Sequence, residues 1–224
     1  MRARYRSAGV GRALLAVTGV AAAAGLAGCA APQSEGPAGV DIAGSTQASD
    51  YVGGQAINTA VALPDVALVD TASQPFNPSS DAAAPVTLVF FGYTNCPDLC
   101  GDTLANTASA IRKLDDATQA AVQMVFVTVD PERDTPEVMG HYLDRFGFPS
   151  YVGLTGELSE IETAAADLRI GLDKHRRLPD GGYEVPHSVE VLGFGADHLA
   201  HVFWSDGTPT ADFAHDIAVL AKAS

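Results

Sequence analysis

The sequence predicts an α/β domain in which helices cover a sheet of buried strands. Two runs of apolar, β-favouring residues, at 86–91 and 122–129, are bounded by turns, as is typical of strands buried on both faces. Apolar residues at helical spacing follow each run, so strands and helices alternate along the chain. The length of 224 residues and an apolar fraction of 47% suit one domain of ordinary size with a substantial core.

The first part of the domain contains a short strand candidate at residues 61–69 and a turn-rich segment at 74–84. After the strand at 86–91 the apolar period changes from strand to helix, with Asp102 or Thr103 available as N-cap. The apolar residues that share one face of this helix are Leu104, Ala108, Ile111 and Leu114. We therefore expect a strand–helix unit here.

A second unit follows, with a strand at 122–129 and a helix at 135–146. Residues 152–154 could add a short strand, and Thr155 is a plausible cap for a further helix. The apolar residues that share one face of that helix are Leu158, Ile161, Ala165 and Leu168. This last pair forms an inserted strand–helix.

The end of the chain predicts a loop at 171–186 and a hairpin of residues 187–194 and 199–204. Thr208 and Pro209 then form an N-cap followed by proline at the first helical position. The residues expected to face inward from this last helix are Phe213, Ile217 and Leu220. The order of elements predicts a thioredoxin-like topology with an inserted strand–helix and an N-terminal strand extension.

The N-terminus has the features of an export signal. Four arginines precede an apolar stretch at 13–27, which is too short for a comfortable membrane span. It ends in LAGC, a tetrad that resembles a bacterial lipobox and makes Cys29 the expected lipidation site. We expect residues 1–28 to be a lipoprotein signal peptide, 29–59 a flexible membrane tether and 60–224 the folded domain. The protein is then lipid-anchored at the extracytoplasmic face of the cell membrane.

The charge of the chain is strongly acidic. Thirteen basic and 27 acidic side chains give a formal net charge of −14. Without the four arginines of the signal, the balance becomes 9 − 27 = −18. Such a surface repels phosphate backbones, so we expect no nucleic-acid partner. Nothing in the sequence points to an oligomer, and a monomer is the default expectation.

Cys96 and Cys100 lie where the first buried strand meets its helix, at the end of the sheet where reactive groups collect. The positive end of a helix lowers thiol pKa and favours thiolate, which attacks disulfides and binds soft metals. A spacing of four residues places both sulfur atoms on one side of a helical turn. A structural disulfide is a third alternative, but it would close almost no loop and would stabilise the chain little.

A metal site needs at least one ligand besides these two cysteines. His187 is the candidate, because the loop entering the penultimate strand of a thioredoxin-like fold faces the cysteine site. Two thiolates and one imidazole form a soft site that suits copper better than magnesium or calcium. The spacing in the sequence does not decide whether His187 is a ligand.

Three motifs resemble the Sco/SenC family of copper-binding assembly factors for cytochrome c oxidase. They are FGYTNCPDLC at 91–100, VTVDPERDTP at 127–136, and the pair His187-Ser188. The resemblance implies a thioredoxin-like domain that binds a copper ion through Cys96, Cys100 and His187. It also implies delivery of copper to the dinuclear copper site of the oxidase. Asn95, Gly101 and Pro186 depart from the common pattern, and none of these changes removes a ligand.

The same cysteine pair supports a second function, that of a thiol–disulfide oxidoreductase that keeps the cysteines of the oxidase copper site reduced. Both functions use Cys96 and Cys100, but only copper binding requires His187. Whether the protein is an enzyme stays open at this point, with a metallochaperone favoured.

Asp130 ends the second buried strand on the side of the site and could tune thiol protonation or offer a weak oxygen ligand. The alternative is that Asp130 shapes the turn before the next helix. Asp134 and Thr135 are expected to shape that turn and cap the helix.

Overall fold

A computed structural model describes residues 50–97, 99–172, 176–177, 183–184 and 187–223. All of them belong to one compact unit, residues 35–224. Cys29, the predicted signal peptide and most of the predicted tether lie outside the described residues. Within the described part of the chain, no helix is both long enough and apolar enough to cross a membrane.

The centre of the fold is a parallel pair of strands, β4 (Val86–Gly92) and β5 (Val122–Thr128). Every residue of β4 is buried, as expected for a strand that carries apolar side chains on both faces. β6 (Tyr151–Thr155) lies parallel to β5 on its other side. These strands confirm the predicted segments at 86–91, 122–129 and 152–154.

A hairpin extends the sheet beyond β4. β9 (Val191–Phe194) pairs antiparallel with β4, and β10 (Ala200–Trp204) pairs antiparallel with β9. At the outer edge, β1 (Gln55–Ala56) pairs with β10. Since β1 lies inside the segment assigned to the tether, the folded part reaches back into residues 29–59.

The opposite edge is formed by β2 (Leu68–Asp70) and β3 (Pro75–Phe76), so the strand order is β1-β10-β9-β4-β5-β6-β2-β3. β2 is the N-terminal strand extension, but the predicted strand at 61–69 is wrong over most of its length. Its first part forms only an isolated bridge between Ala62 and Leu199. The turn-rich segment at 74–84 contains β3 and a short helix, α1 (Pro78–Asp81).

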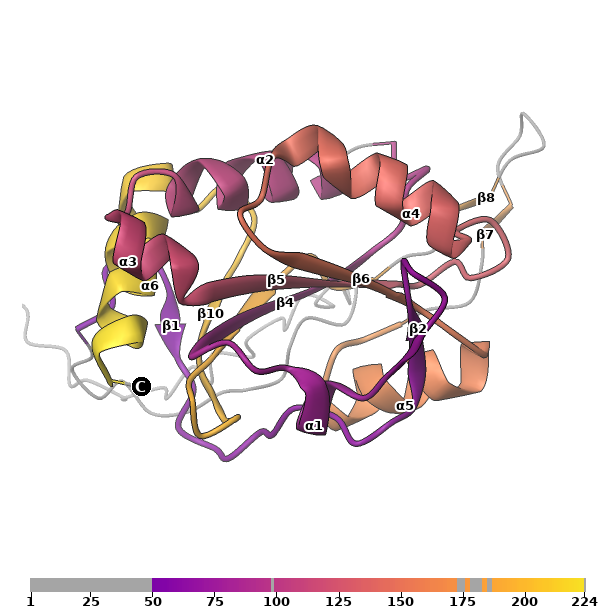
Figure 1. The fold of residues 1–224 in the computed structure, drawn as a ribbon, viewed down its shortest axis with the longest axis horizontal. Coiled ribbons are helices and arrows are strands. Elements are labelled where there is room, and N and C mark those ends of the chain that lie inside the picture. Colours follow the sequence, from indigo (N-terminus) through magenta and orange to yellow (C-terminus); the bar gives the residue numbers. More distant parts are fainter. Residues whose placement is uncertain (1–49, 98, 173–175, 178–182, 185–186, 224) are drawn as a thin grey trace, which may run out of the picture. The chain divides into compact units, whose positions relative to one another are not determined.

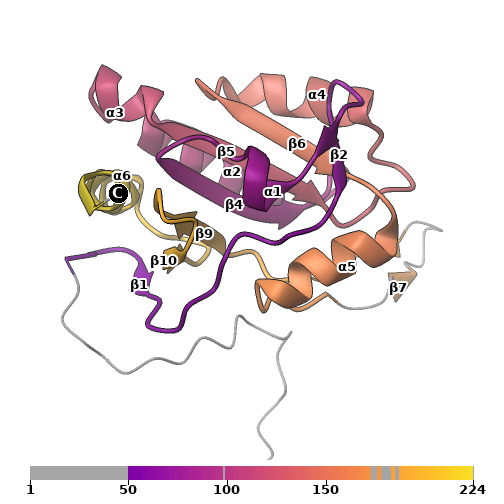
Figure 2. The ribbon, with the colours of Figure 1, turned by 60° about the horizontal axis from the view of Figure 1, so that its bottom comes forward.

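Helices cover both faces of the sheet (Figure 1). α2 (Leu99–Ile111) and α4 (Pro136–Leu143) lie over one face, and α5 (Leu158–Asp167) lies on the other face with α1. Figure 2 shows α5 and α1 in front of the sheet and α4 behind it. α6 (Thr210–Ala223) packs beside α2 and contacts β4 and β9.

Three predicted helix caps are wrong. α6 begins at Thr210, so Pro209 and not Thr208 directly precedes it, and Pro209 is not the first helical residue. α2 begins at Leu99, so Asp102 and Thr103 lie inside the helix and do not cap it. Glu157, not Thr155, precedes α5, because Thr155 is the last residue of β6. The predicted cap at Thr135 is confirmed, since its side chain accepts a hydrogen bond from Val138 N.

The apolar faces of the helices agree with the sequence pattern, with two exceptions. Leu114 is half-buried and lies beyond the end of α2 at Ile111. Leu158 is 41% exposed because it lies in the first turn of α5. The buried residues of the predicted faces are Leu104, Ala108, Ile111, Ile161, Ala165, Leu168, Phe213, Ile217 and Leu220.

Several short elements escaped the sequence analysis. One is α3 (Asp116–Ala120), which Asp115 caps. The helix predicted at 135–146 consists of α4 followed by the 3-10 turn η1 (Asp144–Phe146). The predicted loop at 171–186 contains a second small sheet of β7 (Arg176–Arg177) and β8 (Tyr183–Glu184). Each is shorter than the window over which hydrophobic periodicity can be read.

The carboxylate of Asp216 on α6 ties the first described residues to the domain. It accepts hydrogen bonds from the backbone amides of Val52, Gly53 and Gly54 at 2.8, 3.0 and 2.6 Å, and from Trp204 Nε1 at 3.0 Å. Asp216 is fully buried, and these donors satisfy a carboxylate that would otherwise be costly to bury.

Candidate metal and thiol site

The two cysteines lie at the junction of β4 and α2. Cys96 is half-buried in the connecting loop, where its amide donates to Tyr93 O at 3.2 Å. Cys100 is fully buried in the first turn of α2. Both are free thiols, so no disulfide joins them.

His187 contacts Cys100 directly. Its Nε2 atom lies 3.7 Å from Cys100 Sγ, although 87 positions separate the two residues. The sequence predicted that His187 starts the penultimate strand. In the structure β9 begins only at Val191, so His187 lies in the loop before it. A bridge between Leu172 and His187 holds the histidine, and Ser188 N donates to Gly171 O at 3.2 Å.

Two residues that the sequence analysis did not assign to the site support the histidine. The Tyr93 ring meets His187 edge-on, with centroids 5.7 Å apart and planes at 71°. The Arg133 guanidinium in turn lies over the Tyr93 ring, 5.8 Å from its centroid. Arg133 also forms an ion pair with the buried carboxylate of Asp130. Asp130 is thus connected to His187 through Arg133 and Tyr93.

Tyr93 and Arg133 both lie within the two long motifs. Their assignment requires the tertiary arrangement, because β4 and the β5–α4 turn come together only in the sheet. Their places in these motifs could have marked both residues as candidates, but the sequence does not show which side chain contacts the histidine.

Asp134 fixes the cysteine loop. Its carboxylate accepts from the amide and hydroxyl of Thr94 at 2.9 and 2.5 Å, and from the Thr128 hydroxyl at 2.7 Å. Burial raises the pKa of Asp134, and the hydrogen bonds from Thr128 and Thr94 only partly offset this. The prediction that Asp134 shapes the turn is therefore too narrow, since it also holds Thr94 beside Cys96.

The Cys100 thiol has a raised pKa, caused first by a hydrogen bond with the Cys96 side chain and then by burial. The expectation that the helix start lowers the pKa is therefore wrong for Cys100. The neighbouring sulfur and burial outweigh the backbone hydrogen bond at Tyr93, which lowers the pKa. A metal ion that binds this thiol must displace its proton.

The side chains of Cys96, Cys100 and His187 are not arranged as a complete set of metal ligands. Among the described residues, no three His, Cys, Asp or Glu side chains are gathered as ligands around one point. Cys100 nevertheless contacts both Cys96 and His187. The chemistry of this donor set, two sulfurs and one imidazole nitrogen, matches soft metal ions.

The fold and the site together define a thioredoxin-like protein with a Cys-x₃-Cys pair at the first strand–helix junction and a histidine beside it. Residues 55–222 match the family model described as SCO1/SenC. The chain belongs to the SCO1/SenC family.

Individual relatives agree with this assignment. The zebrafish (Danio rerio) "Protein SCO2 homolog, mitochondrial" is 40% identical over 113 residues, which cover 50% of this chain and 40% of that protein. A structure of Arabidopsis thaliana ScoI with copper bound has a TM-score of 0.66 at 25% identity, covering 73% of this chain and 99% of that chain. A structure of Bradyrhizobium japonicum ScoI with copper bound has a TM-score of 0.59 at 28% identity, covering 69% and 96%.

Proposed function

We propose that the protein is a copper chaperone on the extracytoplasmic face of the cell membrane. It binds copper through Cys96, Cys100 and His187, and it delivers the metal to the dinuclear copper site of cytochrome c oxidase during assembly. The observation that carries this proposal is the 3.7 Å separation of Cys100 Sγ and His187 Nε2. Family membership and the copper-bound relatives support it.

The site has the properties that metal transfer requires. Binding releases the thiol protons, so the affinity rises with pH until both cysteines are thiolates. Three soft ligands leave copper open to attack by an incoming ligand. Cys96 and His187 are both half-buried, which leaves them within reach of a partner, whereas Cys100 is shielded.

Copper titration of the reduced full chain tests the ligand set. We expect His187→Ala to weaken copper binding about tenfold or more, because one of three ligands is lost. His201→Ala is the matched control, since His201 bonds to Asp197 at 3.0 Å. Equal affinities for the wild type and His187→Ala would reject the three-ligand site.

Delivery is tested in cells that carry Cys96→Ser. We expect oxidase activity to fall under copper limitation and to recover when copper is added. Unchanged oxidase assembly under copper limitation would reject delivery. Anchoring is tested by Cys29→Ser, which should release the protein from the membrane fraction.

A thiol–disulfide oxidoreductase is the second candidate, favoured by the hydrogen bond between the Cys96 and Cys100 thiols. Cys96 would attack a target disulfide, and Cys100 would then displace the target thiol. This sequence transfers two electrons and forms a Cys96–Cys100 disulfide. Reduction of a target disulfide that is unaffected by His187→Ala would favour this function over copper delivery.

A further inference from the structure

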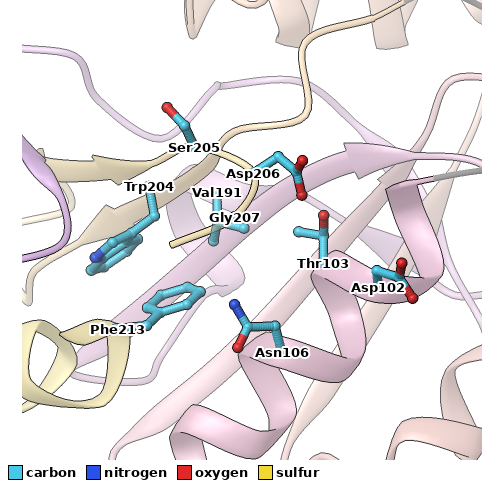
Figure 3. A pocket seen from close by; sticks show the side chains of 9 residues that line it. All are labelled: Asp102, Thr103, Asn106, Val191, Trp204, Ser205, Asp206, Gly207 and Phe213. Atoms are coloured by element: carbon cyan, nitrogen blue, oxygen red, sulfur yellow. The ribbon is translucent and has the colours of Figure 1, made fainter. Parts of the chain in front are cut away.

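A cavity lies against α2, lined by Thr103 and Asn106 of that helix (Figure 3). Its volume is about 170 Å³, close to that of an engineered protein cavity that binds benzene. One side contains Trp204 and Phe213, which are only 1% and 2% exposed and whose ring centroids are 4.4 Å apart. The opposite wall is polar and contains Thr103 and Asp206.

Thr103 carries a polar atom with no partner. The residue is only 9% exposed, and its hydroxyl oxygen is buried without any hydrogen bond. By contrast, the Thr107 hydroxyl donates to Thr103 O at 2.8 Å, and the Ser109 hydroxyl bonds back to the same helix at 2.7 Å. In Figure 3 the Thr103 oxygen points away from α2 toward Asp206. A buried hydroxyl without a partner destabilises the fold unless a ligand satisfies it.

The mouth of the cavity is acidic. Asp206 is exposed in the turn after β10, and Asp102 is exposed on α2. Asn106 lies between the walls but is already occupied, because it donates to Thr208 O at 2.8 Å and accepts from the Thr210 hydroxyl at 2.6 Å. These two bonds join α2 to the segment before α6 and hold the walls in place.

We propose that this cavity binds an arginine side chain of a protein partner. A guanidinium group is planar, stacks on aromatic rings with its faces, and donates hydrogen bonds from its edge to carboxylates and hydroxyls. The Asp206 carboxylate and the Thr103 hydroxyl can both accept hydrogen bonds from this edge, whereas the Trp204 and Phe213 rings lie too deep for stacking. A lysine ammonium is a strongly hydrated point charge and lacks the planar fork of donors that can bond to the carboxylate and the hydroxyl together.

The position of the cavity places the partner at the cysteine site. Asp102 and Thr103 follow Cys100 on α2, so they lie within about 5 Å of it along the helix axis. Val191, which also lines the cavity, follows His187 by four positions. That the partner is the recipient of copper rests on the proposed function, whereas arginine binding itself does not.

Trp204 is the only tryptophan of the chain, so its fluorescence reports on the cavity directly. The experiment titrates Nα-acetyl-arginine amide into the reduced, metal-free full chain in detergent. Nα-acetyl-citrulline amide is the matched probe, because it has the same shape without the charge. We expect a saturable change with the arginine probe and about tenfold weaker binding of the citrulline probe, because citrulline carries no positive charge to form an ion pair with the Asp206 carboxylate.

Three variants complete the test. Asp206→Asn and Thr103→Val should each weaken the arginine probe about fivefold or more, whereas Thr103→Ser keeps the hydroxyl and should bind normally. Asp116→Asn removes an exposed carboxylate of α3, outside the cavity, and should have no effect.

Absence of a saturable change, equal binding of the two probes, or normal binding by Asp206→Asn would each overturn the proposal. Because no copper is present, these outcomes are independent of the copper titration.

Discussion

His187 Nε2 and Cys100 Sγ lie 3.7 Å apart across 87 positions of sequence. The contact joins the loop before β9 to the first turn of α2. β9 pairs with β4, and β4 is the strand that precedes α2 in the chain. The contact brings together the two segments that the sequence singled out separately. The predictions below concern what holds this contact and what the surrounding fold requires.

The two thiols should differ in reactivity. Cys100 is fully buried and its pKa is raised by the hydrogen bond with Cys96 and by burial, whereas Cys96 is half-buried. We expect iodoacetamide to modify Cys96 about tenfold faster than Cys100 or more, because Cys96 is more accessible and the raised pKa of Cys100 lowers its thiolate fraction. The rates are measured by mass spectrometry on Cys100→Ser and Cys96→Ser. Equal rates would contradict the burial of Cys100.

Tyr93 should matter for metal binding as well as for stability of the fold, since its side chain is buried in the core. Tyr93→Ala removes an edge-on ring contact to His187, which is typically worth about 0.5–1.5 kcal/mol. We expect a loss of copper affinity of about two- to tenfold, whereas Tyr93→Phe keeps the ring and the affinity. Copper titration measures the effect. If Tyr93→Ala bound copper like the wild type, the ring would not position the histidine.

Asp134 should be required for a stable cysteine loop. Asp134→Ala leaves the Thr94 amide and the Thr128 hydroxyl without their acceptor, and we expect it to cost about 2–4 kcal/mol. Asp134→Asn should cost less, because the raised pKa, due mainly to burial, means that a neutral group is well tolerated there. Urea denaturation measures both, with Asp116→Ala as an exposed control. Equal costs for Ala and Asn would contradict this account.

Asp216 should contribute to acid sensitivity. Burial raises its pKa, but hydrogen bonds from Val52, His215, Gly54 and Trp204 outweigh burial, so the folded pKa lies below the ordinary value. The unfolded chain therefore binds more protons, and stability falls as the pH drops from about 4 through the folded pKa.

Asp216→Asn should lower the free energy of unfolding at neutral pH and flatten this acid decline. Denaturation at a series of pH values checks both effects. An unchanged acid slope in Asp216→Asn would show that the decline comes from other carboxylates.

Two glycines should respond in opposite ways to alanine. A Cβ on Gly193 would lie 2.8 Å from the Trp204 ring, so Gly193→Ala should destabilise the protein by about 1–3 kcal/mol. A Cβ on Gly101 would meet only the Tyr142 hydroxyl, at 4.0 Å. Because Gly101 lies in α2, Gly101→Ala should stabilise it by about 0.5–1 kcal/mol. Thermal unfolding separates the two. A Gly193→Ala variant as stable as the wild type would contradict the packing at Gly193, and a destabilised Gly101→Ala would contradict the open space at Gly101.

The sequence patterns predicted the strands and helices that are long and strongly periodic. β4 and β5 appear as continuous apolar runs, and α6 appears as a helical stripe, because burial acts on every residue of these elements. The strand predicted at 61–69 failed because apolar composition alone cannot show whether a segment has a pairing partner. β1, with two residues, is fixed by Asp216 and β10 and leaves no periodic signal.

The candidate site was predictable as a set of residues but not as a geometry. Motifs singled out Cys96, Cys100 and His187, yet the raised pKa of Cys100 depends on the hydrogen bond with Cys96 and on burial, which spacing does not reveal. The contacts of Tyr93 and Arg133 likewise depend on side-chain packing across separate elements. Asp130 as a tuning group for the thiols stays a prediction, as does the monomeric state.

The hydrogen bonds between Asp216 and the backbone amides of residues 52–54 have a mechanical consequence. One carboxylate holds three successive backbone amides, so tension applied to the chain ahead of residue 50 is resisted first at α6. The load then passes to Trp204 and β10 at the sheet edge instead of to the β4–α2 junction. A domain pulled by its N-terminal segment would yield at this edge while Cys100 and His187 keep their spacing.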